Sequence, residues 1–293
     1  MPGLIIENDD ICFYVTEKCN SNCIMCPMSL DSRKRGGQMS LEEWEHFEKL
    51  LPTDVSHFTI TGGEPFLYYE KLLPVLKKIN LLYPNTDVLI LTNGRALALE
   101  EIMHVLTPVI TDRYCFAIPI HGANEKTHDS ITMASGSFNQ SIIALRNLSG
   151  TDARIEVRIV GHKKNLEQIN DIFRLLCEVK ARIDIINLVA MEMTGCAARN
   201  RSELWVDYDV LCRKADEGIR YAINHGINVG LYNFPLCQVP ENFWPIVKHS
   251  ITSSKIRYSE GCKQCIRQDA CGGMFYSTYL LNLCSVKPFM EGE

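Results

Sequence analysis

The chain has 293 residues, of which 46% are hydrophobic and 22% are charged, and its formal net charge is −5. This composition predicts a folded protein with a substantial core, and the acidic balance argues against nucleic acid as the main partner. No stretch reaches the ~18 apolar residues of a membrane span, and the first residues lack the pattern of a secretory signal. We therefore expect a cytoplasmic protein with no membrane partner.

The cysteine content is high for such a protein. In a reducing compartment, 13 cysteines indicate metal binding or catalysis before disulfides. An odd number also cannot be fully paired within one chain.

Short β-branched runs alternate with helix-like segments over roughly the first 190 residues. This order predicts an α/β fold with a parallel sheet and right-handed crossovers, and the units are too few for a closed eight-fold barrel. We expect a partial (β/α)6 barrel of the TIM type. A capping box, Ser40 with Glu43, marks the start of the first expected helix. The expected strands are Ile11–Thr16, His57–Thr61, Val88–Thr92, Cys115–Ile120, Ile155–Gly161 and Ile183–Met191, and the expected helices are Leu41–Leu51, Tyr69–Leu82, Leu97–Val105, Asn139–Leu148 and Leu166–Val179.

The pattern changes after Met191. A transition is followed by a helix-like stretch, Tyr208–Asn224, and a short strand, Ile227–Tyr232. From Phe234 onward the chain is rich in Cys, Gly and aromatic residues and has little periodicity, which is typical of a small domain held by a metal. We expect one domain over 8–205 and a second, with a helix–strand extension and a metal-bearing tail, over 206–293.

Three loops follow the expected carboxyl ends of strands, where barrels of this type carry their chemistry. The first holds Cys19, Cys23 and Cys26 in the spacing Cys-x3-Cys-x2-Cys. Three thiolates in one loop can surround a four-iron cluster and leave one iron open, whereas structural zinc needs four ligands. The second loop is Gly62-Gly63-Glu64-Pro65, and the third is Asn93-Gly94. One basic run, Arg33-Lys34-Arg35, is typical of a solvated loop.

The cysteine spacing after the first strand, together with Gly-Gly-Glu-Pro after the second, resembles the radical S-adenosylmethionine (SAM) superfamily. The resemblance implies a [4Fe-4S] cluster whose open iron is chelated by SAM. It also implies a flavodoxin- or ferredoxin-type reductant, reductive cleavage of SAM, and hydrogen abstraction from a substrate by the 5′-deoxyadenosyl radical. Gly62, Gly63, Glu64 and Pro65 would hold the SAM amino group, because glycines allow close approach and Glu64 can accept a charged hydrogen bond.

Other candidates for SAM or substrate contacts lie at later strand ends, where structural or surface roles are also common. No catalytic base is assigned. Met25 stands where the family often has an aromatic residue, and it can still pack against adenine. The candidates at the strand ends are Asn93, His121, Arg158, His162, Asn165 and Glu192.

A second cysteine group lies in the tail. Cys262, Cys265 and Cys271 have the spacing Cys-x2-Cys-x5-Cys, and Cys237 supplies a fourth ligand, with Cys284 as an alternative. The chemistry of four cysteines leaves zinc and iron–sulfur equally open. The tail is similar to the twitch domain of some radical SAM enzymes, a shortened SPASM domain, which implies one auxiliary [4Fe-4S] cluster. We expect the other five cysteines (Cys12, Cys115, Cys177, Cys196 and Cys212) to be small buried hydrophobes.

The twitch and SPASM resemblance implies a ribosomally made peptide or protein as the substrate. Three segments are similar to the C-type radical SAM maturase of the His-Xaa-Ser peptide system: His128-Asp129 with Gly136–Phe138, Ile155–Val160, and Cys262–Tyr276. Two alternatives stay open. One is a small-molecule enzyme of cofactor biosynthesis, and the other is a non-catalytic iron–sulfur or zinc protein, for which the Gly-Gly-Glu-Pro loop has no evident use.

Overall fold

A curved, open sheet forms the centre of the protein. The computed structural model describes residues 3–7, 10–38, 40–52, 54–250 and 255–291. Within these residues the sheet has nine strands in chain order, from β1 to β9. The first two strands are antiparallel, and every later strand is parallel to the one before it. The strands are β1 (Gly3–Glu7), β2 (Asp10–Tyr14), β3 (His57–Thr61), β4 (Asp87–Leu91), β5 (Tyr114–Pro119), β6 (Arg154–Val160), β7 (Ile185–Val189), β8 (Asn228–Tyr232) and β9 (Val247–Lys248).

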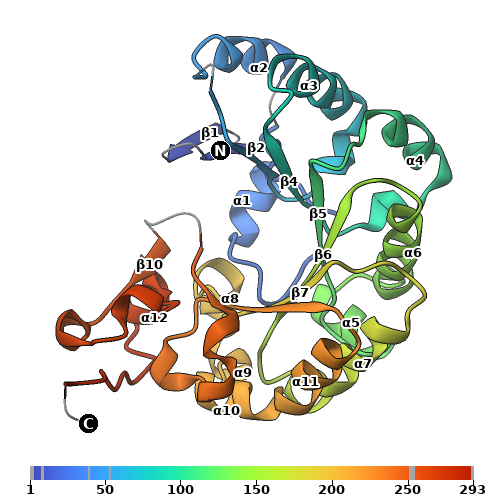
Figure 1. The fold of residues 1–293 in the computed structure, drawn as a ribbon. Helices are drawn as coiled ribbons and strands as arrows, with labels where there is room; N and C mark the ends of the chain where they lie inside the picture. The colour runs from blue at the N-terminus through green and yellow to red at the C-terminus, as the bar shows by residue number, and fades with distance from the viewer. Residues whose placement is uncertain (1–2, 8–9, 39, 53, 251–254, 292–293) are drawn as a thin grey trace.

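The partial barrel expected from the sequence is confirmed. Each of the six expected strands overlaps one of β2–β7, and in the described chain the edge strands β1 and β9 do not pair with each other (Figure 1). The sheet is larger than expected, because β1, β8 and β9 extend it. Since β8 and β9 follow residue 205, the sheet also continues into the expected second domain. The domain boundary itself stays a prediction, and its outer limits at 8 and 293 lie outside the described residues.

Helices cover the convex side of the sheet (Figure 1). The predicted capping box is confirmed at the start of α2: Ser40 Oγ accepts from Glu43 N at 3.1 Å, and the Glu43 carboxylate accepts from Ser40 N at 2.7 Å. The stretch expected as one helix after Tyr208 is two helices. The helices are α1 (Leu30–Arg35), α2 (Leu41–Glu48), α3 (Tyr69–Leu82), α4 (Glu100–Leu106), α5 (Glu125–Thr132), α6 (Ser137–Ser149), α7 (Ile169–Glu178), α8 (Gly195–Arg199), α9 (Arg201–Leu204), α10 (Tyr208–Lys214), α11 (Asp216–Asn224) and α12 (Tyr276–Leu280).

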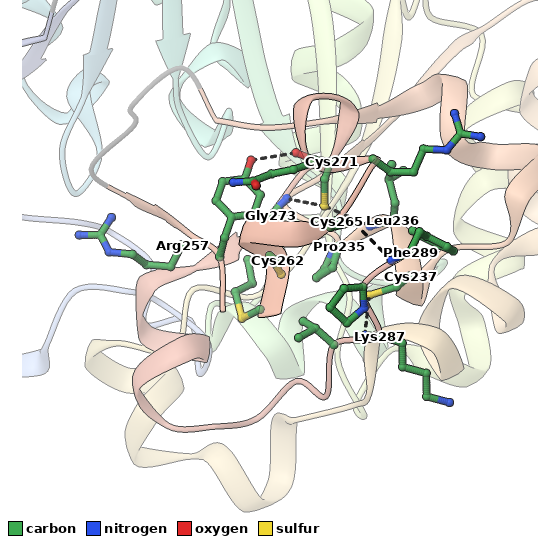
Figure 2. A pocket seen from close by; sticks show the side chains of 16 residues that line it. Pro235, Leu236, Cys237, Arg257, Cys262, Cys265, Cys271, Gly273, Lys287 and Phe289 are labelled. Atoms are coloured by element: carbon green, nitrogen blue, oxygen red, sulfur yellow. Dashed lines mark hydrogen bonds between the residues drawn. The ribbon is translucent and has the colours of Figure 1, made fainter. Parts of the chain in front are cut away.

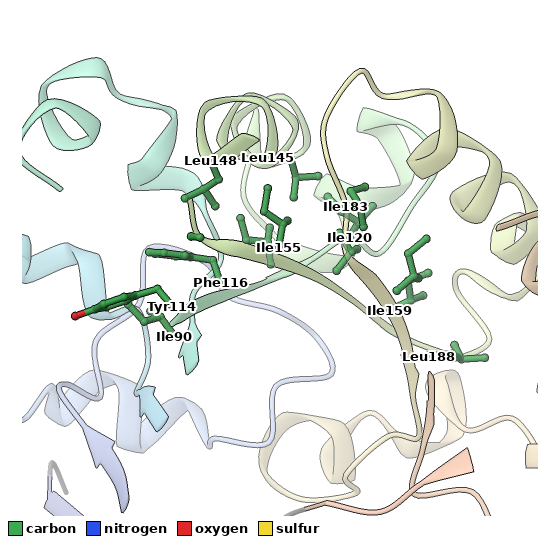
Figure 3. Close-up of a cluster of buried hydrophobic side chains, with 14 of the residues drawn as sticks. Ile90, Tyr114, Phe116, Ile120, Leu145, Leu148, Ile155, Ile159, Ile183 and Leu188 are labelled. Atoms are coloured by element: carbon green, nitrogen blue, oxygen red, sulfur yellow. The ribbon is translucent and has the colours of Figure 1, made fainter. Parts of the chain in front are cut away.

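Side chains alternate between the two faces of the sheet, as strand geometry requires. The outward set packs under the helices; Figure 3 shows Ile90, Phe116 and Ile155 of three neighbouring strands against Leu145 and Leu148 of α6. The inward set is more polar and only partly buried. The fold therefore leaves a polar inner wall at the concave side of the barrel.

The segment His128-Asp129 with Gly136–Phe138 has a structural role. The Asp129 carboxylate accepts hydrogen bonds from Gly136 N at 2.6 Å, Ser137 Oγ at 2.8 Å and Phe138 N at 2.9 Å, and so fixes the start of α6. Burial acts to raise the pKa of Asp129, but these hydrogen bonds keep it below its ordinary value. The residues of this segment that are similar to the His-Xaa-Ser maturase therefore hold the start of helix α6.

The C-terminal part lies beside the open side of the barrel (Figure 1). It contains a two-stranded antiparallel sheet of β10 (Ile256–Arg257) and β11 (Met274–Phe275), followed by α12. The hydroxyl of Ser277 accepts a hydrogen bond from Met193 N at 2.8 Å. This contact connects the C-terminal part to the loop after β7.

Candidate metal centres

The three N-terminal cysteines lie together in the loop after β2. Burial, followed by the charges of neighbouring acidic groups, raises the pKa of Cys19 to about 11 and that of Cys23 to about 12. Cys26 is one of the neighbours that raise the pKa of both Cys19 and Cys23. Ser21 N lies 3.4 Å and Asn93 Nδ2 3.7 Å from Cys19 Sγ, both as donors. The thiols are therefore protonated when nothing is bound, and a metal that takes them as thiolates displaces protons.

The loop after β3 packs directly against the backbone of this cysteine loop. Gly63 N donates to Thr16 O at 2.6 Å, and Glu64 N donates to Lys18 O at 2.8 Å. A Cβ atom on Gly62 would lie 2.4 Å from Thr16 O, and one on Gly63 would lie 2.1 Å from Lys18 O. The two glycines are thus required by the close approach of two loops, whatever ligand they also contact.

The Glu64 side chain is fully buried and points into the protein interior. Its carboxylate accepts hydrogen bonds from Phe66 N at 3.0 Å, Thr92 Oγ1 at 2.7 Å and Asn93 N at 2.7 Å. Burial raises its pKa, although these three hydrogen bonds act in the opposite direction. The expected contact between this carboxylate and the SAM amino group stays a prediction, since these three hydrogen bonds leave an acceptor position open on Oε2. The backbone of Gly62–Pro65 is a candidate beside it.

Asn93, at the end of β4, does reach the cysteine loop. Besides Cys19 Sγ, its Nδ2 contacts Asn20 Oδ1 at 2.7 Å. Arg95, which the sequence analysis missed, donates to Asn20 O and lies 3.4 Å from Ser21 Oγ. The carboxyl ends of β2, β3 and β4 therefore meet around Cys19.

The opposite side of the cysteine loop is held by the segment after β7. Cys196 N donates to Cys26 O at 2.9 Å, and Thr194 Oγ1 donates to Pro27 O at 3.1 Å. A Cβ on Gly195, whose φ is +53°, would lie 2.3 Å from Pro27 O. Glycine is thus required where α8 meets this loop.

The basic run lies in a helix, and one of its members is buried. The expectation of a solvated loop is wrong at Arg33, which lies in α1 with 9% of its surface exposed. Its Nη1 donates to Ser21 O at 3.1 Å and its Nη2 to Cys196 Sγ at 3.0 Å. The sequence carries a signal for this placement. Ser29 caps the start of α1, and Gly36, at φ +62°, ends it.

His121 lies in a buried group of histidines. It is 3% exposed, its ring stacks on His128 with centroids 5.8 Å apart, and its N–H donates to His128 Nδ1 at 3.1 Å. His162 is also fully buried, and burial lowers the pKa of His128 and His162 to about 4. No hydrogen bond joins His121 to the cysteine loop in the described residues. The expected contact between His121 and SAM stays a prediction.

Arg158 and Glu192 face the inner wall of the barrel. Arg158 Nε lies 2.5 Å from Glu156 Oε1, which also accepts from Asn187 Nδ2 at 2.7 Å. Glu192 forms an ion pair of 3.2 Å with Lys255, a partner that the sequence analysis missed. Lys255 comes from the C-terminal part, so its position could not be predicted from the local pattern. Through these two ion pairs, the inner wall of the barrel carries both positively and negatively charged side chains.

The four predicted C-terminal cysteines line one small cavity (Figure 2). Cys284 is not among its lining residues. Residues 286–289 close one side, which the sequence did not indicate. The described chain holds no His, Cys, Asp or Glu group that converges on a single metal ion. The lining cysteines are Cys237, Cys262, Cys265 and Cys271.

Each of these sulfur atoms has a hydrogen-bond partner. Lys287 N donates to Cys237 Sγ at 3.3 Å, and Phe289 N donates to Cys265 Sγ at 3.4 Å (Figure 2). Donors aimed at sulfur stabilise thiolate ligands and adjust the potential of a cluster. The remaining contacts are Leu236 N and Gly273 N to Cys271 Sγ, at 3.4 Å and 3.5 Å, and Ser259 Oγ with Cys262 Sγ at 3.3 Å.

The family model described as "Radical SAM superfamily" matches residues 13–176, more than half of the chain. The chain belongs to the radical SAM superfamily. The match begins in β2, includes the cysteine loop and ends in α7.

Two similar proteins carry names that point to different products. The chain is 27% identical to "AdoMet-dependent heme synthase" of Methanosarcina barkeri, with 58% of this chain and 48% of that protein covered. It is also 27% identical to the "Antilisterial bacteriocin subtilosin biosynthesis protein AlbA" of Bacillus subtilis, with 60% and 38% covered. The chain thus spans less than half the length of these curated relatives.

A solved structure has a similar fold. Streptococcus suis SuiB bound to precursor peptide SuiA matches with a TM-score of 0.60 and 16% identity, over 76% of this chain and 48% of SuiB. At this identity the likeness supports the fold alone. In the described residues, no helix has both the length and the apolar character needed to cross a membrane.

Radical SAM membership implies a [4Fe-4S] cluster and SAM. The cysteine loop fits such a group on its own geometry. Three thiols lie in one short loop, donors face Cys19 Sγ, and a buried cation, Arg33, contacts that loop from α1. The C-terminal cavity also fits a cluster, since four cysteines line it and each sulfur has a hydrogen-bond partner.

Proposed function

We propose that this radical SAM protein is an enzyme that cleaves SAM reductively at a [4Fe-4S] cluster on Cys19, Cys23 and Cys26. The observation that carries the proposal is the packing of the Gly62-Gly63 backbone onto the loop of these three cysteines. The bound cluster and SAM supply an electron and a carbon radical that abstracts hydrogen from the substrate. The electron comes from a flavodoxin- or ferredoxin-type reductant, in keeping with a cytoplasmic location.

The chain's own residues hold and shield this centre. Glu64 fixes the loop after β3 to the end of β4, and Asn93 places an amide donor against Cys19. The α8 segment holds Cys26 and Pro27 from the other side. Asn93 and the backbone of Gly62–Pro65 are the residues that we place against SAM.

A second [4Fe-4S] cluster occupies the C-terminal cavity in this proposal. The hydrogen-bond donors on its sulfur atoms favour a cluster over zinc, because such donors adjust the potential of a redox centre and zinc is not redox-active. Cys237 is the fourth ligand, because Cys284 does not line the cavity. The residues over 206–293 would then form an extension and a twitch-like domain.

The substrate that we propose is a ribosomally made peptide or protein. The names of AlbA and of SuiB with its precursor peptide support this class, and the His-Xaa-Ser maturase remains our closer proposal. The inner wall offers Arg158 and Glu192 to a substrate with both charges, such as a peptide backbone with polar side chains. The name of the heme synthase supports a second candidate, a small-molecule enzyme acting on a tetrapyrrole.

One experiment tests the cluster and the substrate together. The protein is reconstituted anaerobically, and iron, sulfide and the EPR signal are measured for wild type and for C19A/C23A/C26A. We expect about eight irons per chain in wild type and about four in the variant. Candidate precursor peptides and tetrapyrroles are then added with SAM and dithionite. Faster SAM consumption with a peptide supports a maturase, and faster consumption with a tetrapyrrole supports the second candidate.

A variant that keeps all its iron, or a wild type that binds zinc, contradicts the proposal.

A further inference from the structure

Arg33 is a buried cation, and no described residue gives it an anionic partner. Its guanidinium donates to a backbone carbonyl, Ser21 O, and to the sulfur of Cys196. Its Nε is buried and has no hydrogen-bond partner in the described chain. Among the described residues, no ion pair involves Arg33. Within the part of the chain that the structure describes, one positive charge is therefore buried beside the cysteine loop without an ion pair.

An uncompensated buried charge is unfavourable, because water is lost and no opposite charge replaces it. The groups near Arg33 that can become negative are the cysteines of the loop. Arg33 contacts the carbonyl of Ser21, which lies between Cys19 and Cys23 in the chain and whose N–H donates to Cys19 Sγ at 3.4 Å. Thiolates bound to a metal centre would give Arg33 the negative charge that it lacks.

The position of Arg33 fits this role. It lies in α1, which directly follows the cysteine loop, and its two Nη atoms connect Ser21 within the loop to Cys196 on α8. Cys196 Sγ also donates to Met28 O at 3.4 Å, which fixes the sulfur that accepts from Arg33. The guanidinium is thus held in place from two sides before any metal is bound.

We propose that Arg33 is a positioning residue that serves as the built-in counter-charge of the cluster on Cys19, Cys23 and Cys26. This inference rests on the proposed cluster. A fixed positive charge favours the reduced, more negative form of a nearby cluster and so raises its reduction potential. The same charge stabilises the loaded loop and destabilises the empty one.

Two properties separate this role from a merely structural one. If Arg33 only holds Ser21 and Cys196 in place, Arg33→Met lowers the melting temperature of both the empty and the loaded protein. If it is a counter-charge, Arg33→Met leaves the empty protein at least as stable as wild type, because an unpaired buried charge has been replaced by an apolar side chain. The gain in melting temperature on loading becomes smaller.

The experiment compares wild type, R33M, R33K and K34M as full-length proteins, empty and after anaerobic reconstitution. Lys34 is the matched control, since it is the exposed neighbour on the same helix. The reduction potential is measured by EPR for the signal that is absent from C19A/C23A/C26A. We expect a more negative potential in R33M, an unchanged one in K34M, and a value close to wild type in R33K, which keeps the charge.

A wild-type potential in R33M, or an equal shift in K34M, overturns the inference while the proposed function stands. The same holds if the empty R33M protein melts well below wild type. If wild type has no signal that depends on Cys19, Cys23 and Cys26, the proposed function fails, and the inference fails with it.

Discussion

The Glu64 carboxylate accepts a hydrogen bond of 2.7 Å from the backbone N–H of Asn93 and so joins the loop after β3 to the end of β4. Asn93 in turn contacts Cys19 Sγ at 3.7 Å, so the hydrogen bond between Glu64 and Asn93 N also helps to orient the cysteine loop. Glu64 is therefore best understood as a support for the loop, although its sequence context suggested a ligand for SAM.

Glu64→Gln is predicted to lower both stability and iron content. Either oxygen that becomes an amide NH2 then faces a backbone N–H, of Phe66 or of Asn93. An unsatisfied buried donor of this kind lowers the free energy of unfolding by about 2–3 kcal/mol. Urea unfolding of the empty protein measures the loss of stability. The control is Glu70→Gln, at an exposed position of α3. Equal stability of the two variants would contradict the support role.

Gly63→Ala is predicted to disturb the cysteine loop through steric overlap alone. The new Cβ would lie 2.1 Å from Lys18 O, whereas a Cβ on Gly150 meets nothing closer than Asn147 O at 3.4 Å. Overpacking of this kind lowers stability by about 1–3 kcal/mol. We expect Gly63→Ala to reconstitute with less iron than wild type and Gly150→Ala to match it. Normal iron in Gly63→Ala would mean that the two loops can separate freely.

The C-terminal cavity gives a prediction on metal removal. Replacing Cys262 and Cys265 by Ala should remove about four irons per chain and leave the EPR signal of the N-terminal cluster. Cys284→Ala serves as the control, because Cys284 does not line the cavity, and it should keep all the iron. Elemental analysis measures the iron and zinc content of both variants. Iron loss in Cys284→Ala, or zinc at the site, contradicts the proposed ligand set.

The buried histidines predict sensitivity to acid. Burial lowers the pKa of His128 and His162 from 6.5 to about 4, so between these values the unfolded chain binds protons that the folded protein does not. Stability must then fall as the pH falls, by about 2 kcal/mol per histidine between pH 6.5 and 5. Unfolding free energies of the empty protein across this range measure the slope.

His162→Leu should reduce this slope by about one proton, whereas replacing the exposed His46 by Gln should leave it unchanged. A slope that is the same in all three proteins would show that His162 does not carry the effect.

Much of the barrel could be predicted because strands and helices leave local patterns. Strand β3 and helix α3 occur where alternation and helical period placed them, and the loops at the carboxyl ends of strands gather around Cys19. What could not be predicted depends on contacts between distant segments. Lys255 reaches Glu192, 63 residues away in the chain, and no local pattern records that approach.

Side-chain orientation could not be predicted from the sequence either. Glu64 and His121 stand at strand ends, as predicted, and both face the interior, because buried donors and aromatic neighbours surround them; their contacts with SAM stay predictions. Arg33 shows the reverse case. Charge alone predicted a solvated residue, whereas the caps at Ser29 and Gly36 set a helix that turns it toward Cys196.

The most direct test of the account is the formation of 5′-deoxyadenosine from SAM by the anaerobically reconstituted protein with dithionite. The account predicts 5′-deoxyadenosine from wild type and none above background from C19A/C23A/C26A, with the C262A/C265A variant still forming it. Failure of the fully loaded wild type to cleave SAM, or cleavage that survives loss of the three N-terminal cysteines, would contradict the central claim.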